Sequence, residues 1–176
     1  RQDRRIGHGI RLESQLRRRL PGQYFMLTFT MPEQIRTFCR SNQSLAYETL
    51  FNAAAGSIKK LARDPRYIGS DLPGFTGVLH TWGRQMQYHP HVHFIVVAGG
   101  LSKNREKWLT AGNNFYLPVR PLAKIFKARF KAAMEKNGML PLIDPKVWQI
   151  TWNVNCQAVG DAEASLKYLA PYVFRV

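Results

Sequence analysis

The hydrophobic positions of this chain fall into several short runs that have the character of β-strands. The runs are rich in aromatic and β-branched residues or alternate with a two-residue period, and proline, glycine or polar residues bound them. The predicted strands are residues 23–31 (QYFMLTFTM), 74–82, 91–98, 114–119 and 147–154 (VWQITWNV). A polar segment joins the second run to the third, so we expect these two to pair as an antiparallel hairpin.

Other apolar residues recur at the spacing of an amphipathic helix. One such helix begins after Ser44, a plausible N-cap, and ends near Asp64-Pro65. A second begins with Pro121 at its first position and ends at Asn137-Gly138, and a short final helix follows Asp161. This order of elements predicts an α+β domain, with an antiparallel-dominated central sheet and helices packed on it.

The length and composition suit one compact domain. Of the 176 residues, 45% are hydrophobic, which is enough for one core but short for two. We assign residues 1–22, which are rich in arginine, to a basic N-terminal arm or linker, and residues 23–176 to the folded domain. Because the chain begins with Arg1 instead of methionine, we expect it to be a piece of a longer protein.

The charge balance indicates a polyanionic partner. Lysine and arginine number 26 against 11 acidic residues, a formal net charge of +15, and nucleic acid is the first candidate. A membrane surface is the alternative, but no apolar run approaches the roughly 20 residues that span a bilayer, and no signal peptide is visible. We therefore expect a cytoplasmic protein without a membrane partner.

Several side chains are candidates for DNA contact. Each candidate is as well explained by a solvated face or a packed core. Those expected to contact phosphates are Lys124, Lys127 and Lys131 on the polar face of the second long helix, and Arg17, Arg18 and Arg19 in the arm. Those expected to stack on bases are Trp82, Tyr88 and Trp108.

The two cysteines do not indicate a disulfide or a zinc site. Cys39 and Cys156 lie far apart in the sequence and outside any paired spacing. We expect both to be buried, reduced thiols.

Three of the five histidines occur in the short segment His89-Pro90-His91-Val92-His93. In a strand, His91 and His93 point to the same face, and His80 on the preceding strand can lie opposite them. Three histidines leave coordination positions open, as in catalytic metal sites. The alternative is that they are partly buried histidines in hydrogen bonds. Because Pro90 suits the start of a strand, we place His89 in a loop or beside the ligands instead of among them.

Tyr168 and Tyr172 are four residues apart near the end of the chain. On a helix this spacing places both hydroxyls on one side, although an ordinary aromatic stripe has the same spacing. Pro171 disfavours helical torsions at Ala170, so Tyr172 is expected to lie past a kink.

Three segments together resemble a known family. They are YFMLTFTMPEQ, LHTWGRQMQYHPHVHFIVVAGGLS and the terminal YLAPYVFRV, and they are similar to the two-tyrosine transposases of the HUH class, which move bacterial insertion sequences by a rolling-circle route. The resemblance covers residues 24–176. It implies a palm-like sheet related to the RRM fold, the HUH pair on a central strand, and tyrosines on a helix that faces a divalent ion. Family members usually carry an N-terminal cysteine-rich zinc module, which this chain does not match.

The resemblance also implies an activity. Residues 23–176 would form an HUH-type catalytic domain that nicks and rejoins single-stranded DNA of transposon ends and target through a 5′-phosphotyrosine intermediate, in the bacterial cytoplasm in association with the nucleoid. His80, His91 and His93 would hold the metal, most readily Mg²⁺ or Mn²⁺, although Zn²⁺ or Ni²⁺ equally suits histidine ligands on affinity. Tyr168 and Tyr172 would be the nucleophiles. A relaxase, a rolling-circle replication initiator, a zinc hydrolase or a noncatalytic nucleic-acid-binding module are the alternatives.

Overall fold

The computed structural model describes residue 20 and residues 22–83, 85–112 and 115–160. Within these residues the chain forms a five-stranded antiparallel sheet and two long helices. The strands are β1 (Tyr24–Thr30), β2 (Leu72–Trp82), β3 (Tyr88–Leu101), β4 (Trp108–Thr110) and β5 (Asn153–Ala158). Their order is β2-β3-β1-β5, and β4 pairs with the end of β3. The expected α+β class with an antiparallel sheet is confirmed.

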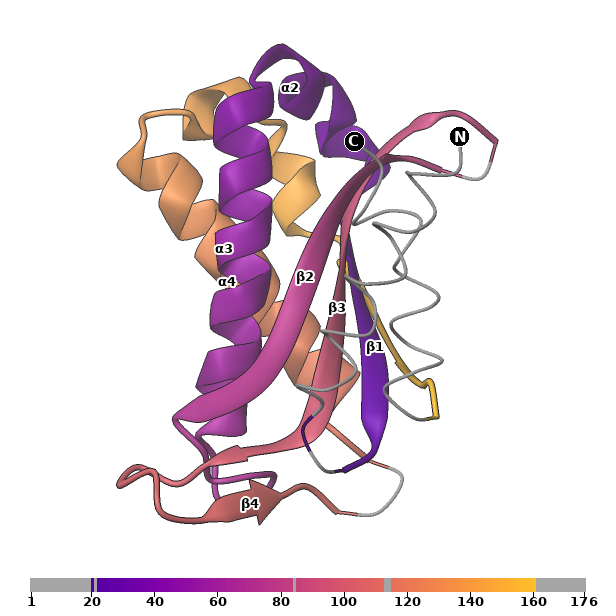
Figure 1. The fold of residues 1–176 in the computed structure, drawn as a ribbon. Helices are drawn as coiled ribbons and strands as arrows, with labels where there is room; N and C mark the ends of the chain where they lie inside the picture. Colours follow the sequence, from indigo (N-terminus) through magenta and orange to yellow (C-terminus); the bar gives the residue numbers. More distant parts are fainter. Residues whose placement is uncertain (1–19, 21, 84, 113–114, 161–176) are drawn as a thin grey trace, which may run out of the picture.

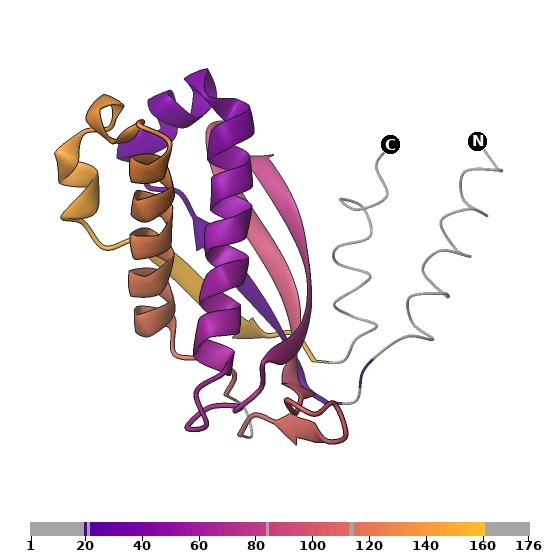
Figure 2. The same cartoon turned by 90° about the vertical axis from the view of Figure 1, so that its left-hand side faces the viewer.

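The helices lie on one side of the sheet. Helices α3 (Gln43–Ala62) and α4 (Val119–Lys136) run side by side over the same sheet face (Figures 1 and 2). A short helix α2 (Arg36–Ser41), which follows the 3₁₀ turn η1 (Glu33–Ile35), connects β1 to α3 at one end of the sheet (Figure 1). Two further 3₁₀ turns, η2 (Leu140–Leu142) and η3 (Pro145–Trp148), lead from α4 into β5. None of the helices within the described residues is long and apolar enough to cross a membrane.

The core between the sheet and the helices is built around Phe94 of β3. Its ring packs against Phe29 of β1, Phe51 of α3 and Phe75 of β2, with ring centroids 5.1–6.0 Å apart. Gly77 of β2 pairs with Phe94 in the ladder, and a Cβ there would collide with the phenylalanine ring. Phe94 therefore fixes which face of β3 points to the helices.

Alternation along β3 then decides the direction of the side chains next to Phe94. Val92 and Phe94 are fully buried on the helix side of the sheet. Because side chains of a strand alternate, His91 and His93 project from the opposite face. The fold thus separates the hydrophobic core from the histidines by the thickness of one sheet.

The structure confirms the predicted first strand, the hairpin and the two long helices. Strand β3 is longer than predicted at both ends, and α4 begins at Val119, two residues before Pro121.

Two predicted strands are wrong. Residues 115–118 have no regular secondary structure and Val119 opens α4, while the short strand β4 lies earlier, at Trp108–Thr110. Residues 147–154 are not one strand, because Val147 belongs to η3 and β5 begins only at Asn153.

The second error has a clear physical cause. Asp144 caps η3 by accepting a hydrogen bond from the backbone N–H of Lys146, and Pro145 starts the turn. The apolar residues that follow do not alternate along a strand but pack on α4. Trp152 places its ring 5.1 Å from Phe126 and 5.3 Å from Phe130. The predicted final helix and, apart from residues 20 and 22, the predicted basic arm lie outside the described residues, so the domain boundary between residues 22 and 23 stays a prediction.

Candidate metal centre

The sheet brings three histidines together. His80 of β2 is the direct ladder partner of His91 of β3, and His93 lies two residues further along the same face. Each ring offers a ligand nitrogen, and these atoms all lie within 4.8 Å of one another. The ring centroids are 4.6–5.2 Å apart. The three rings thus converge on one point, as the ligands of a three-histidine metal site do.

Hydrogen bonds orient two of the three rings. Nδ1 of His91 lies 2.6 Å from the carbonyl oxygen of His89, and since a carbonyl can only accept, Nδ1 carries the proton. Nδ1 of His93 lies 2.9 Å from the hydroxyl oxygen of Thr28, which is its partner across the β1–β3 ladder. The carbonyl of His89 fixes the tautomer of His91 and leaves its Nε2 as the atom that can bind a metal, whereas the hydroxyl of Thr28, which can donate or accept, orients the ring of His93 without fixing its tautomer.

The surroundings of the site favour neutral imidazoles. Burial lowers the pKa of His80, His91 and His93 below the ordinary value of histidine, because it disfavours the charged ring. For His93, burial and the neighbouring His91 and His80 lower the pKa to about 4. At neutral pH all three rings therefore carry the neutral form that ligates metals, without a proton to displace.

His89 lies next to this group but is not part of it. Its ring centroid is 5.2 Å from that of His91. Nδ1 of His89 lies 2.6 Å from Nη2 of Arg36, so it accepts a hydrogen bond from the guanidinium. Burial and the charge of Arg36 lower the pKa of His89. His89 is thus a neutral base engaged by an arginine of α2.

Comparison with known proteins identifies the family. The family model described as "Putative transposase" matches residues 74–176, which contain His80, His91, His93, Tyr168 and Tyr172. The chain belongs to this transposase family.

Two curated relatives of this transposase domain are considerably longer than the chain. "Putative transposase y4qJ" of Sinorhizobium fredii is 36% identical over 163 residues, which cover 91% of this chain and 38% of the relative. "Transposase for insertion sequence element IS801" of Pseudomonas savastanoi pv. phaseolicola is 36% identical over 112 residues, which cover 56% of this chain and 26% of the relative. The chain therefore spans well under half the length of these two relatives.

Similar solved structures include conjugative relaxase TrwC in complex with oriT DNA. The metal-bound structure is 13% identical with a TM-score of 0.48, and the match covers 64% of this chain and 43% of the relaxase chain. The metal-free structure is 12% identical with a TM-score of 0.47, and the match covers 64% of this chain and 44% of the relaxase chain.

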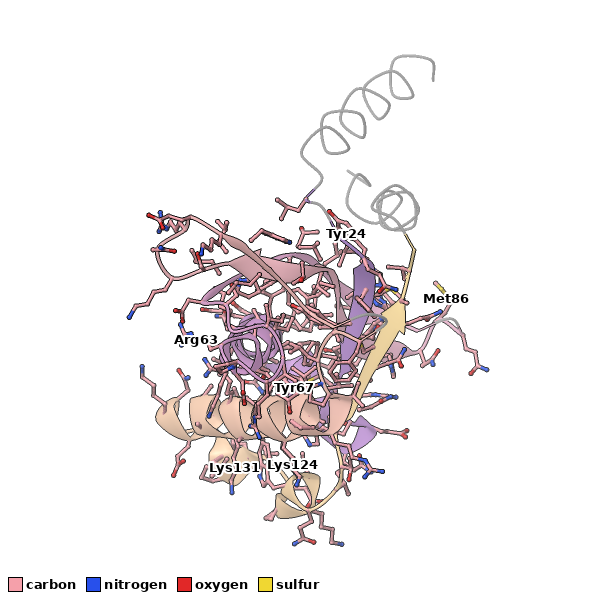
Figure 3. All side chains as sticks on the ribbon, turned by 90° about the horizontal axis from the view of Figure 1, so that it is seen from below. Tyr24, Arg63, Tyr67, Met86, Lys124 and Lys131 are labelled. Atoms are coloured by element: carbon pink, nitrogen blue, oxygen red, sulfur yellow. The ribbon has the colours of Figure 1, made fainter. Side chains whose placement is uncertain are left out.

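The three lysines predicted to contact DNA, Lys124, Lys127 and Lys131, lie on the helix layer, not beside the histidines. Lys124 and Lys131 project from the side of α4 that faces away from the sheet (Figure 3). Nζ of Lys127 donates hydrogen bonds to the carbonyl oxygens of Trp148 and Ile150, and Nζ of Lys131 is 5.8 Å from the ring centroid of Trp148. The structure does not bring these lysines to the metal centre.

The aromatic candidates divide between the two ends of β3. Trp82 and Tyr88 flank the β2–β3 turn near the histidines, with ring centroids 6.1 Å apart, and Trp82 is 54% exposed. Trp108 lies on β4, opposite Leu101 at the other end of β3. Tyr168, Tyr172 and Arg17 to Arg19 lie outside the described residues.

The cysteines of the transposase domain match the expectation of reduced thiols. Cys39 is buried and Cys156 half-buried, and both are free. Burial raises the pKa of Cys39 to about 12 and that of Cys156 to about 11.

Thr28 and Arg36 were not among the residues predicted for this region. Thr28 contacts His93 only because β1 lies beside β3, and Arg36 contacts His89 only because α2 folds back over the end of the sheet. An alternating strand that carries a threonine on its polar side was the one local signal for Thr28.

Proposed function

We propose that this domain cleaves and rejoins single-stranded DNA at the ends of an insertion sequence, with a divalent metal and a tyrosine nucleophile. The observation that carries the proposal is the convergence of three neutral histidines on one face of an antiparallel sheet, in a chain of a transposase family. The formal charge of +15 supports a polyanionic substrate.

The residues present fit a divalent ion. Three nitrogen ligands lie close enough to share one ion, and His89 and Thr28 orient two of the rings. We propose that His80, His91 and His93 hold Mg²⁺ or Mn²⁺. When bound, the ion would neutralise charge on the nonbridging oxygens of the scissile phosphate and help to align it.

The chain supplies the nucleophile from its C-terminal segment. We propose that the hydroxyl oxygen of Tyr168 attacks the phosphorus, so that a tyrosyl–phosphate bond forms as the bond from phosphorus to the 3′ oxygen breaks. The phenolic proton is lost and the 3′ oxygen leaves as a hydroxyl, while the phosphate stays on the 5′ oxygen of the strand downstream of the break, as a 5′-phosphotyrosyl link. The covalent link keeps the phosphodiester energy, so a 3′ hydroxyl can reverse the step and rejoin a strand without ATP.

The second tyrosine permits a second link. Tyr172 would accept another DNA end, or the same end in a later transfer, and the spacing of four residues supports a paired role. A hydrolase that used the same histidines would need neither tyrosine.

The decisive experiment is a search for a covalent protein–DNA adduct. The chain is incubated with labelled single-stranded oligonucleotides from insertion-sequence ends and Mn²⁺, and denaturing gel electrophoresis detects the adduct. We expect an adduct that depends on metal and disappears in the Tyr168→Phe/Tyr172→Phe double variant. DNA cleavage by the double variant at the wild-type rate would overturn the tyrosine chemistry and favour a hydrolase.

A further inference from the structure

A second cluster of polar side chains lines a cleft beside the metal centre. The cleft has a volume of about 380 Å³ and lies between α2 and the first residue of β3. Its lining residues are Arg36, Thr37, Arg40, Ser41 and Tyr88. Tyr88 packs toward the helix layer, where its hydroxyl meets that of Tyr47. Arg36 links the cleft to the histidines, because its Nη2 lies 2.6 Å from Nδ1 of His89, whose ring centroid is 5.2 Å from that of His91. The cleft and the histidines are therefore close enough for one DNA strand to contact both.

Two arginines of this cleft have no carboxylate partner. Arg36 and Arg40 lie four residues apart on α2, and so project from the same side of the helix. Within the described part of the chain, neither forms an ion pair. Glu33 acts electrostatically on His89 but does not pair with either guanidinium. Two unneutralised guanidinium groups beside one cleft favour an anionic ligand.

One hydrogen-bond donor of Arg36 also lacks an acceptor in the part of the chain that the structure describes. One of its N–H groups is bonded to His89, whereas its Nε is buried and has no hydrogen-bond partner among the described residues. A buried donor without an acceptor costs free energy, and most such groups in proteins have a partner. His89 thus holds one side of Arg36, while the residue still lines the cleft.

The wall of the cleft is aromatic and held in place. The hydroxyl of Tyr88 lies 2.9 Å from the hydroxyl of Tyr47 in α3, and the guanidinium carbon of Arg40 lies 5.9 Å from the Tyr88 ring centroid. The ring of Trp82 meets Tyr88 edge to face and is 54% exposed. An arginine next to a fixed ring and an exposed indole is a typical surface for a single strand, because phosphates pair with guanidinium groups while bases stack.

We propose that this cleft binds a backbone phosphate of the single-stranded DNA substrate, close to the scissile phosphate, and that Trp82 stacks on an adjacent base. Arg36 and Arg40 would hold the phosphate, with the hydroxyls of Thr37 and Ser41 as further donors. The inference rests on the proposed function, because it takes the DNA strand at the histidines as the source of the phosphate. In this arrangement Arg40 is a positioning residue that sets which phosphodiester reaches the metal.

The test combines a protein variant with a DNA substrate that has one phosphate neutralised. A series of single-stranded oligonucleotides is made, each with one uncharged methylphosphonate at a different position, and their affinities are measured in EDTA by fluorescence anisotropy. Wild-type protein should lose affinity when the phosphate in the cleft is neutralised. Arg40→Gln should bind the unmodified strand several-fold more weakly and should be insensitive to the methylphosphonate at that position. Its log–log salt slope should fall by about 0.7, the value for one phosphate contact on a single strand.

Arg120→Gln is the matched control. Arg120 is exposed in the first turn of α4, at the end of the molecule opposite α2, and its substitution removes the same charge (Figure 1). Arg120→Gln should retain the wild-type sensitivity at every position. Trp82→Ala provides a second readout, with an expected loss of affinity that does not change the salt slope, and melting temperatures show whether each variant is folded.

The outcomes separate this inference from the proposed function. If wild-type protein forms the covalent adduct but Arg40→Gln is as sensitive as the wild type to the methylphosphonate at every position, the cleft does not bind a phosphate and the proposed function stands. If no adduct forms but Arg40→Gln becomes insensitive to the methylphosphonate at one position where the wild type is sensitive, the cleft stands and the cleavage chemistry fails. Equal loss of affinity in Arg40→Gln and Arg120→Gln, with unchanged patterns, would show only nonspecific charge attraction and would overturn the proposal.

Discussion

The hydroxyl oxygen of Thr28 lies 2.9 Å from Nδ1 of His93, across the ladder that joins β1 to β3. The contact orients the imidazole ring of His93. Thr28 belongs to β1, which carries none of the three histidines of the metal centre. Thr28→Val keeps the β-branched shape but removes the oxygen, so the ring is no longer oriented. We expect Mn²⁺ affinity to fall by about 10- to 100-fold, the usual effect of losing such a partner, as measured by calorimetric titration. Thr28→Ser should preserve most of the affinity, and an unchanged affinity in Thr28→Val would contradict the role.

The histidines should differ sharply in their effect on metal binding. Removal of the ring in His93→Ala takes away one of three converging ligands, and we expect Mn²⁺ binding to become undetectable under conditions that saturate the wild type. His89→Gln is the matched control, because His89 lies outside the ligand group and its backbone carbonyl, which orients His91, remains. Tight Mn²⁺ binding by His93→Ala, or its loss in His89→Gln, would require a different ligand set.

Acid should destabilise the metal-free protein. His93 takes up its proton near pH 6.5 in the unfolded chain but only near pH 4 in the folded protein. Between these values the unfolded state binds more protons, so the free energy of unfolding falls as the pH falls through this window. The lowered pKa values of His80 and His91 act in the same direction. Urea unfolding in EDTA at several pH values should show this loss, and His93→Gln should reduce it. A wild-type stability that is constant from pH 7 to pH 4.5 would be inconsistent with buried neutral imidazoles.

The buried thiol should be inert in the folded protein. The pKa of Cys39 is raised to about 12 by burial, so the reactive thiolate is scarce at pH 8, and the side chain is inaccessible. We expect Cys39 to react with a thiol reagent such as DTNB only after unfolding, and Cys156 to react slowly in the native state. A Cys156→Ser variant isolates Cys39 for this measurement. Rapid labelling of that variant under native conditions would mean that α2 is open.

The two tyrosines should act in order. Tyr168 precedes Pro171 and Tyr172 follows it, so regular helical geometry is expected only for Tyr168. We expect Tyr168→Phe to bind DNA and metal normally but to form far less adduct in the first cleavage, whereas Tyr172→Phe should cleave once and fail in strand transfer. Adduct formation and strand joining, assayed separately for each single variant, test this order. Loss of first cleavage in Tyr172→Phe alone would reverse it.

Local patterns were sufficient to predict the elements that carry the histidines. The alternation in β2 and β3 indicated a hairpin, and antiparallel pairing placed His80 opposite His91, as the structure has it. The position of Thr28 was not accessible in this way, because it depends on β1 lying between β3 and β5. Which strands become neighbours is a property of the packed sheet and not of any single segment.

The errors arose where apolar residues pack without a regular period. Val147 of η3 and Trp152 just before β5 are both buried, and a run of apolar residues in an irregular segment resembles a strand in composition. The same segment presents the carbonyls of Trp148 and Ile150 to Lys127. A lysine that the helical spacing assigned to a solvated face thus contributes to tertiary structure, which no pattern within α4 could indicate.

Strand β3 has paired neighbours on both sides, and this has a consequence for its dynamics. The backbone around His91 and His93 is bonded to β1 on one side and β2 on the other, and the residue between them is fully buried. Amide hydrogens in such a strand exchange with solvent mainly when the whole domain unfolds. The histidines are therefore preorganised, so an arriving ion would not have to order the backbone that carries them. Hydrogen exchange at Val92 and His93 should consequently be among the slowest in the domain even before any metal is added.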